Sequence, residues 1–446
     1  MQAKSQRLCS LFLSSNELCG TLEGIPNPLY SFMYSIDVSN NSLAGHIPKS
    51  FFDLTRLQQL KLDSNHFQGT VELSLLWKLR SLYSLMFSNN MLSVKDVEDD
   101  YPFTYLDNIR TLGLASCSLT KIPIALRYTN ELSYLDLSNN QIDGVIPSWI
   151  WMNWKDSIFF LDLSNNMFTC LENSPSIVHM HNLEYLNLSS NQLHGSVPIP
   201  LTARKSMVFL DYSNNNFSSI TPDFGCMLQT IDLNNNLIEG EIPRSLSNCQ
   251  GLELLDVGNN QIVGSFPSWF GILPHLRVLV LRSNQLNGTI RDIKHDQTIN
   301  NYFASLQILD LASNNFSGNL PKGWFNELKA MMENVSDEGQ VLGHETSSSA
   351  GFYQDTVTIT FKGSDLSFIK ILSTFNAIDI SNNSFDGHVP ESIGMLVSLR
   401  GLNMSYNNFT GQIPFQYRNL SQLEPMDLLE PDNRGNTTRV NLTYFS

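Results

Sequence analysis

Few residues of this sequence have the types and the spacing that chemistry requires. His179 and His181 form an H-x-H pair without further ligands at metal spacing, so a solvated loop is favoured over a zinc site. Four acidic residues fall within 96–100, but they lack the spacing and the glycine of a calcium-binding loop. No phosphate-binding glycine loop, nucleophile elbow or kinase signature is present in the sequence. The sequence therefore predicts a binding protein rather than an enzyme, with no metal and no cofactor.

The charge balance argues against two classes of partner. The 446 residues contain 27 Lys and Arg against 42 Asp and Glu, for a formal net charge of -15. Nucleic acid and anionic membrane surfaces both require a basic face, so neither is expected. No run of about 20 apolar residues exists, and no membrane-spanning helix is predicted. Asparagine is unusually frequent, at 46 residues, which indicates that side-chain amides have a repeated structural task.

The asparagines belong to a repeated phrase that positions every other feature. The phrase L-x-x-L-x-L-x-x-N-x-L recurs from Leu8 onward, most copies being 23 to 26 residues apart. In a leucine-rich-repeat solenoid, the L-x-L pair forms a short strand whose leucines point inward, and the Asn satisfies backbone polar groups at the turn. The sequence therefore predicts an α/β-type repeat, a curved arc with a parallel β-sheet on its concave face. Its fifteen copies carry Asn16, Asn41, Asn65, Asn90, Cys117, Asn140, Asn166, Asn191, Asn215, Asn236, Asn260, Asn284, Asn314, Asn383 and Asn407.

The second half of the repeat contains the pattern G-x-apolar-Pro in eight copies. Gly permits a tight turn and Pro fixes φ, so an extended edge and a bend are expected here rather than a helix. The chain thereby resembles the plant-specific class of leucine-rich repeats, whose repeats end in L-x-G-x-I-P. The eight copies begin at Gly45, Gly144, Gly195, Gly240, Gly264, Gly318, Gly387 and Gly411.

An insertion interrupts the repeats between Asn314 and Asn383. It resembles the island of plant leucine-rich-repeat receptor-like proteins, the kinase-less group that includes the tomato leaf-mould and wilt resistance receptors. In that family the island helps to form the surface read by a ligand or a co-receptor kinase. Apart from the resemblance, 356–361 alternates as an added strand would, and the polar, Ser-rich stretch 333–350 predicts a mobile loop. The island residues singled out are Tyr353, Gln354, Asp355, Lys362 and Gly363.

These patterns predict four segments. Repeats occupy 1–318, the island and the start of the next repeat 319–376, two further repeats 377–420, and an aborted repeat with an irregular tail 421–446. The resemblance implies a location at the extracellular face of the plasma membrane for the full-length family. Those receptors begin with a signal peptide and a cysteine-paired cap, which this sequence does not show, so we expect an ectodomain lacking both ends.

The outward positions of the strands are the candidate ligand-binding surface. Exposed aromatic residues are enriched at interfaces, and Arg can pair with a carboxylate of a peptide or partner. Arg277 and Arg282 could instead offset neighbouring acidic repeats. The candidates are Tyr34, Tyr134, Phe160, Tyr185, Arg277, Arg282 and Arg400. Eight repeats also carry an Asp just before the second core residue of the strand. The favoured interpretation is that L-D-L-S is ordinary in this family, and the alternative is an acidic stripe that binds a basic peptide. The eight residues are Asp37, Asp136, Asp162, Asp211, Asp232, Asp256, Asp310 and Asp379.

Covalent modifications would follow from secretion. Cys226 and Cys249 lie one repeat apart, so they could lie side by side and form a disulfide. Glycosylation is expected at the N-x-S/T motifs. They begin at Asn40, Asn187, Asn216, Asn287, Asn315, Asn334, Asn382, Asn403, Asn408, Asn419, Asn436 and Asn441.

The resemblance favours one function over two others. The favoured one is an extracellular recognition module of a plant receptor-like protein, acting in pathogen defence. Its partners would be a peptide or protein ligand, pathogen-derived in the defence case, and receptor-kinase co-receptors through which it signals. One alternative is a secreted inhibitor of a microbial cell-wall enzyme, but such inhibitors have fewer repeats and no island. The other is a truncated product without activity.

Overall fold

A computed structural model describes most of the chain as two compact units, Met1–His194 and Gly195–Ser446. The described residues are 8–76, 78–96, 108–172, 180–198, 209–221, 228–291, 302–333 and 374–423, together with the short strands 343–345, 352–354, 357–361, 364–368, 430–431 and 437–438.

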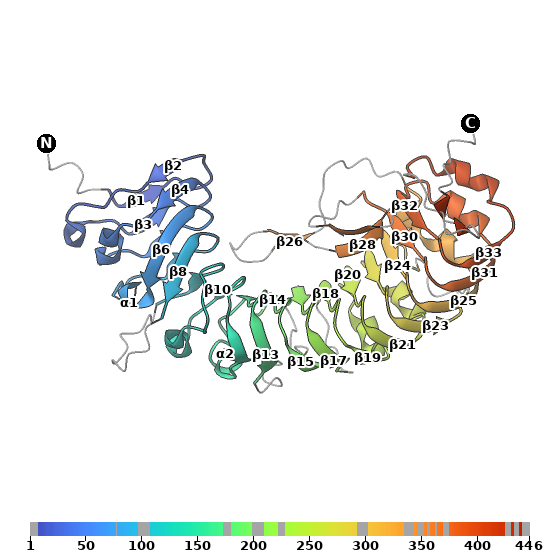
Figure 1. Cartoon of the computed structure of the whole chain (residues 1–446), viewed down its shortest axis with the longest axis horizontal. Coiled ribbons are helices and arrows are strands. Elements are labelled where there is room, and N and C mark those ends of the chain that lie inside the picture. The colour runs from blue at the N-terminus through green and yellow to red at the C-terminus, as the bar shows by residue number, and fades with distance from the viewer. Residues whose placement is uncertain are drawn as a thin grey trace. The chain divides into compact units, whose positions relative to one another are not determined.

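The first unit is built on a ladder of parallel three-residue strands that follow one another in chain order (Figure 1). The middle residue of each strand points into the core, as Leu60, Leu135 and Leu161 do, each fully buried. The first and third residues point outward, because successive side chains of a strand alternate between its two faces. The strands are β1 (Ser10–Phe12), β3 (Ser35–Asp37), β5 (Gln59–Lys61), β7 (Ser84–Met86), β9 (Thr111–Gly113), β10 (Tyr134–Asp136), β12 (Phe160–Asp162) and β14 (Tyr185–Asn187).

The second unit repeats the ladder and passes over the insertion without a break. Strand β24 pairs directly with β30, Ile308 opposite Ala377, although the insertion lies between them in the chain. Its strands are β16 (Phe209–Asp211), β18 (Thr230–Asp232), β20 (Leu254–Asp256), β22 (Val278–Val280), β24 (Ile308–Asp310), β30 (Ala377–Asp379) and β32 (Gly401–Asn403). With the first unit this makes fifteen ladder strands among the described residues, which confirms the predicted leucine-rich-repeat solenoid.

Buried asparagines connect each repeat to the one before it, as predicted. Asn140 donates from Nδ2 to the carbonyl oxygens of Leu114 (2.9 Å), Leu137 (2.9 Å) and Ser138 (3.1 Å). Its Oδ1 accepts the backbone N–H of Leu119 at 2.9 Å. Asn65, Asn166, Asn236, Asn260, Asn284 and Asn314 repeat this donor pattern. One side chain thereby satisfies several backbone groups that a tight turn would leave buried and unpaired.

The second half of each repeat is extended, and all eight glycines of the G-x-apolar-Pro pattern have positive φ, from 72° at Gly387 to 113° at Gly264. That conformation costs glycine little, which explains the residue choice. These segments form further parallel strands, namely β2 (Cys19–Thr21), β4 (Ser42–Gly45), β6 (His66–Glu72), β8 (Met91–Lys95), β11 (Asp143–Ile146), β13 (Met167–Leu171), β15 (His194–Val197), β17 (Asn216–Ile220), β19 (Glu239–Gly240), β21 (Gln261–Ser265), β23 (Gln285–Gly288), β25 (Asn315–Asn319), β31 (Ser384–His388) and β33 (Asn408–Thr410).

Short helices follow the extended segments, a feature that the sequence analysis left out. Pro48, Pro243, Pro390 and Pro414 each precede a single 3-10 turn, because a fixed φ suits the residue that begins it. The helices are η2 (Pro28–Tyr30), η3 (Lys49–Asp53), α1 (Leu73–Leu76), η4 (Ile124–Tyr128), α2 (Trp149–Asn153), η6 (Arg244–Asn248), η7 (Ser268–Ile272), η8 (Trp324–Glu327), η9 (Lys329–Met331), η10 (Glu391–Met395) and η11 (Phe415–Asn419).

The insertion contains two antiparallel hairpins. Strand β28 (Val357–Phe361) pairs with β29 (Ser364–Phe368), which confirms the strand predicted within 356–361. Strand β26 (Gly343–Glu345) pairs with β27 (Phe352–Gln354), so the prediction of a loop throughout 333–350 is wrong at 343–345. Backbone pairing can form there despite the polar composition on which the loop prediction was based. In the tail, β34 (Glu430–Pro431) pairs antiparallel with β35 (Thr437–Thr438).

Candidate functional site

Three aromatic side chains form a stack on the outward face of the ladder in the first unit. Tyr134, Phe160 and Tyr185 occupy the first position of adjacent strands and lie in register. The ring centroids of Tyr134 and Phe160 are 4.3 Å apart with planes 10° from parallel, and those of Phe160 and Tyr185 are 4.2 Å apart at 4°. All three residues are candidates from the sequence, and the structure brings them together.

Tyr34, the fourth aromatic candidate, does not belong to this stack. It precedes β3, so Ser35 holds the register position that Tyr134 holds in its own repeat. Tyr34 is 45% exposed. The one-residue offset arises because Ile36 fills the core position of this strand, and only its direct neighbours point outward.

Carboxylates border the aromatic stack. Burial, followed by the charges of Asp136, Asp162 and Asp63, raises the pKa of the Tyr134 hydroxyl far above its ordinary value. The Tyr185 hydroxyl lies 3.4 Å from Oδ2 of Asp162. Burial, reinforced by the charge of Asp37, raises the pKa of Asp63 to about 6. Asp63 is not among the candidates predicted from the sequence. Its place two residues beyond β5, on the outward face, is the signal that could have found it.

The eight aspartates of the L-D-L-S phrase have a structural role. In each, Oδ1 accepts the backbone N–H of the residue two positions later, as Asp136 does from Ser138 at 3.0 Å. Asn187 and Asn403 occupy the same position and accept in the same way, at 2.9 and 3.2 Å. Because Asn serves as well, the turn requires the acceptor oxygen and not the negative charge.

The outward face of the second unit is largely buried. Leu254, Val278 and Ile308 hold its first strand position and form an apolar cluster with Val280 and Ala377, against which Phe375 packs. Asp256, Asp310 and Asp379 are buried beside them. The candidate site therefore lies on the first unit, where Tyr134, Phe160 and the neighbouring carboxylates are partly exposed. Tyr185, the third ring of the stack, is only 5% exposed.

Two of the three cationic candidates are engaged within the second unit. Arg282 is only 9% exposed, and its Nη1 lies 3.9 Å from Oδ2 of Asp310, so it is not presented to a ligand as expected. The carboxylates and apolar residues of the neighbouring strands explain this burial. Arg277 donates from Nε to Gln307 at 2.9 Å, and Arg400 is half-buried.

The N-x-S/T motifs divide into two groups by the exposure of the asparagine, Asn187 and Asn403 being half-buried. The Asn187 Nδ2 donates to the Tyr185 hydroxyl at 3.3 Å, and the Asn403 Nδ2 to Asp379 at 3.0 Å. Exposed side chains are found at Asn40, Asn216, Asn287, Asn315, Asn382, Asn408 and Asn419. Asn334, Asn436 and Asn441 lie outside the described residues.

Several other candidates are placed only in part. Cys249 is buried and disulfide-bonded, whereas Cys226, its expected partner, lies outside the described residues. Tyr353 and Gln354 fall in β27, while Asp355, Lys362 and Gly363 lie outside the described residues. His179 also lies outside the described residues. The His181 Nδ1 lies 3.0 Å from Oδ1 of Asp156.

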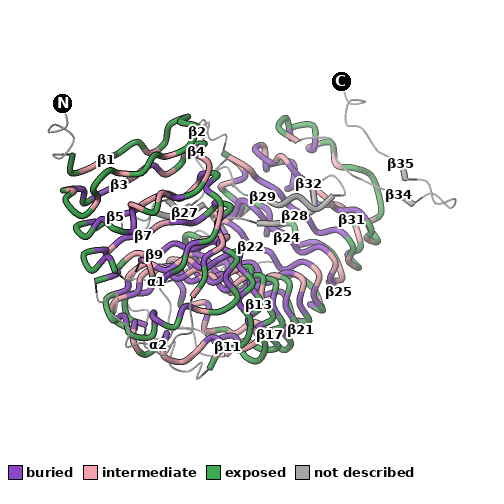
Figure 2. The backbone as a smooth tube through the Cα atoms, turned by 60° about the vertical axis from the view of Figure 1, so that its left-hand side comes forward, coloured by how far each residue is buried: buried purple, intermediate pink, exposed green. Residues whose placement is uncertain are grey.

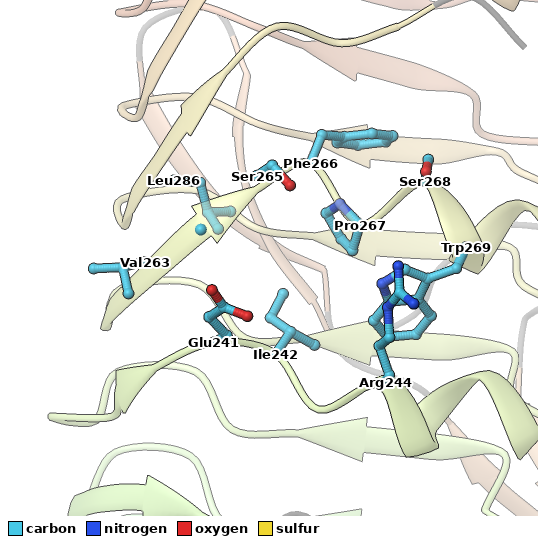
Figure 3. A pocket seen from close by; sticks show the side chains of 11 residues that line it. Glu241, Ile242, Arg244, Val263, Ser265, Phe266, Pro267, Ser268, Trp269 and Leu286 are labelled. Atoms are coloured by element: carbon cyan, nitrogen blue, oxygen red, sulfur yellow. The ribbon is translucent and has the colours of Figure 1, made fainter.

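A pocket lies away from the ladder strands, on the second sheet of the second unit. Glu241, Arg244 and Trp269 border it, with Val263 of β21 and Leu286 of β23 (Figure 3). Within the described residues, no His, Cys, Asp or Glu cluster is placed to hold a metal ion. No helix in the described ranges has the length and apolar character needed to cross a bilayer.

Comparison with known proteins places this architecture among plant receptors. Models described as leucine-rich repeat match residues 226–286, and also 131–153, 182–203, 305–326 and 398–420. Receptor-like protein 35 of Arabidopsis thaliana is 33% identical over 384 residues, which cover 78% of this chain and 39% of that protein. The chain spans about half the length, or less, of the curated relatives it matches, from 38% to 54%.

Two solved structures share the fold. The plant peptide hormone receptor RGFR1, in complex with RGF2, superposes with a TM-score of 0.73 at 26% identity, covering 95% of this chain and 59% of that one. The Arabidopsis receptor kinase HAESA, in complex with the peptide hormone IDA and the co-receptor SERK1, gives 0.50 at 25% identity, covering 98% of this chain and 84% of that one.

Proposed function

The chain belongs to the leucine-rich-repeat receptor-like proteins of plants, and on that premise we propose that it recognises a peptide or protein ligand outside the cell. The observation that carries the proposal is the aromatic stack of Tyr134, Phe160 and Tyr185 on the ladder of the first unit. Aromatic side chains dominate interface energetics because they bury a large area at low entropic cost.

The ligand-binding surface in this proposal is the outward face of β10, β12 and β14. There the first strand position carries an aromatic ring and the third a polar side chain, Asp136, Asp162 or Asn187. An extended peptide laid across these strands would meet rings in one row and polar groups in the next. The HAESA ectodomain is bound to a peptide hormone and a co-receptor, and this similarity supports the same two kinds of partner here.

The proposal extends to the cellular location of the protein, its signalling partner and the source of its ligand. We place the protein at the extracellular face of the plasma membrane, where a partner receptor kinase transmits the signal, and the ligand is pathogen-derived. Receptor-like proteins 35, 32 and 18 of Arabidopsis thaliana, to which the chain is similar, support the placement at a receptor surface.

The test is a selection of peptide binders followed by a comparison of two variants. A library of random twelve-residue peptides is selected against the full chain secreted from plant cells. The test variant is Phe160→Asp, which puts a charge in the middle of the stack. The control is Val145→Asp, an exposed apolar residue of β11 in the same unit.

We expect the selected peptides to bind Phe160→Asp at least about tenfold more weakly, since removing an aromatic hot-spot residue from an interface costs about 2 kcal/mol or more of binding free energy. Binding to Val145→Asp should stay unchanged, and thermal melts check that both variants are folded. Equal binding to Phe160→Asp and to the unaltered chain would contradict the proposal.

A further inference from the structure

The pocket on the second sheet of the second unit contains two opposite charges that are not paired with each other. Its volume is about 190 Å³. Glu241 follows β19 and Arg244 begins η6, and Figure 3 shows them on either side of Ile242. Within the part of the chain that the structure describes, neither charged side chain makes an ion pair or a hydrogen bond. The pocket therefore offers one acceptor and one donor, both of them available.

The next repeat supplies the floor and the apolar surface of the pocket. Gly264 of β21 has φ 113°, and a Cβ built on it would lie 3.4 Å from Cγ of Glu241. The side chain of Glu241 thus extends over the glycine, which adds no side chain of its own. Val263 and Trp269 line the pocket from the same repeat, and both are at least partly exposed. Apolar and aromatic surface with a few polar groups is typical of a site that orients a small ligand.

The two charged groups suit a sugar ring. Their charges sum to zero, so the pocket favours a ligand without net charge. The Glu241 carboxylate only accepts hydrogen bonds and the Arg244 guanidinium only donates them, whereas a hydroxyl group does both. A sugar carries hydroxyl groups at its edge and C–H groups on its faces, so it can bond both side chains while it packs against the Trp269 indole. The pocket is smaller than the roughly 300–1,000 Å³ of most ligand pockets, which also fits one ring better than a peptide segment.

A glycosylation motif lies beside the pocket. Residues 287–289 read Asn-Gly-Thr, and the side chain of Asn287 is exposed. Asn287 of β23 is in register with Ser265 of β21, which lines the pocket. Register partners of a parallel sheet face the same side, and neighbouring strands are about 4.8 Å apart. In Figure 2, β21 and β25 lie along one side of the second unit, with exposed segments in green.

We propose that this pocket holds the first N-acetylglucosamine residues of a glycan that Asn287 itself carries. Glycosylation joins the Asn287 Nδ2 to the anomeric carbon of a lipid-pyrophosphate-linked oligosaccharide and releases the lipid pyrophosphate and a proton. The covalent link then gives the sugar a roughly millimolar effective concentration, so weak contacts suffice to keep the pocket filled. The proposal requires the extracellular placement proposed above, and it assigns this face to the protein's own glycan instead of a ligand.

The test measures how fast each glycan is removed from the folded chain. The full chain is secreted from plant cells treated with a mannosidase inhibitor and is then incubated with endoglycosidase H, which cuts between the first two sugars. Peptide mass spectrometry follows each site. Asn408, exposed on β33 of the same unit, is the control site within the same molecule. We expect removal at Asn287 to be about tenfold slower than at Asn408 in the folded chain and equally fast after denaturation, because the enzyme acts on the fraction that has left the pocket.

Two variants locate the protection. Arg244→Ala removes the donor, and Trp269→Leu removes the ring. Each should speed removal at Asn287 about fivefold or more and leave Asn408 unchanged. Arg244 is exposed, so its variant keeps the test valid if Trp269→Leu does not fold. The control is Glu239→Ala, an exposed carboxylate of β19 that does not line the pocket, and it should change neither site.

A second measurement separates the attached glycan from a free sugar. N,N′-diacetylchitobiose is titrated into the Asn287→Gln and Asn408→Gln chains and followed by saturation-transfer NMR. The Asn287→Gln chain has an open pocket and should bind the disaccharide in the millimolar range. The Asn408→Gln chain keeps its glycan at Asn287 and should not bind it. Equal binding to both chains, or binding to neither, would overturn the proposal.

The remaining outcomes separate this proposal from the extracellular placement that it requires. Equal removal at Asn287 and Asn408 from the folded chain would overturn the docked glycan. A glycan at Asn408 with none at Asn287 would also overturn it and would leave the extracellular placement intact. A secreted chain without a glycan at any motif would contradict both.

Discussion

Replacing Cys117 by asparagine should stabilise the protein, although the change puts a more polar group into the core. Cys117 stands where the other fourteen repeats carry Asn. It is fully buried, and its Sγ lies 3.5 Å from the Ala115 carbonyl oxygen and 3.9 Å from that of Phe87. A thiol is a weak donor, so these carbonyl groups gain little from it.

The magnitude follows from the next repeat, where Asn140 makes the full set of bonds. Its Nδ2 lies 2.9 to 3.1 Å from three carbonyl oxygens, and its Oδ1 accepts two backbone N–H groups at 2.9 and 3.0 Å. Each such bond is worth about 1 kcal/mol net. After subtracting the burial of the thiol, we expect Cys117→Asn to raise the free energy of unfolding by about 1–3 kcal/mol.

The assay is urea denaturation followed by far-ultraviolet circular dichroism, with hydrogen exchange at β9 as a local readout, because repeat arrays can unfold in parts. Asn140→Ala is the opposite control and should lower the free energy of unfolding by about 2–4 kcal/mol. A Cys117→Asn protein that is less stable than the unaltered chain by about 1 kcal/mol or more would refute the reasoning.

Three further predictions follow from buried or engaged side chains. Burial, reinforced in Asp232 and Asp310 by the charge of a neighbouring aspartate, raises the pKa of Asp232, Asp256, Asp310 and Asp379, in Asp256 to about 6, and outweighs the hydrogen bonds that lower it. These groups therefore bind protons more tightly in the folded chain than in the unfolded chain. Their contribution to the free energy of unfolding is complete below pH about 4 and is lost as pH rises through about 6, so the urea midpoint should be higher at pH 5 than at pH 7.5. The Asp256→Asn variant should show a smaller difference between the two midpoints. An unchanged difference would exclude Asp256 as a contributor. Peptide mass spectrometry of the secreted chain should find glycans at the exposed Asn216, Asn287 and Asn408 but not at Asn187 or Asn403, which are half-buried with hydrogen-bonded amides. Full occupancy at Asn403 would contradict this. Burial, with the charge of Asp136, raises the pKa of the Cys117 thiol to about 12. Iodoacetamide at pH 8 should therefore leave Cys117 unmodified in the folded chain and alkylate it in urea. Rapid labelling of Cys117 in the folded chain would refute its burial.

The repeat made the fold predictable from the sequence. One Asn every couple of dozen residues fixed the place of each turn, and the glycines of G-x-apolar-Pro fixed the positive φ values. Both are local rules, so a single sequence suffices to apply them. The short helices after the prolines were missed because a single 3-10 turn gives no periodic signal.

The candidate site was predictable only in part. Tyr134, Phe160 and Tyr185 were found because they depart from the phrase at one register position, whereas Tyr34 was misplaced by a single residue. Arg282 was taken as exposed because the phrase places it near the outward face. Its burial depends on Asp310 and on the apolar residues of neighbouring strands, which a pattern within one repeat does not contain.

Hydrogen exchange of the chain bound to a library-selected peptide tests most directly whether the ladder of the first unit is the recognition surface. The account predicts added protection in β9, β10, β12 and β14, with the second sheet β2–β4–β6–β8 unchanged. Protection confined to that second sheet, or to the strands around the Glu241 and Arg244 pocket, would contradict it.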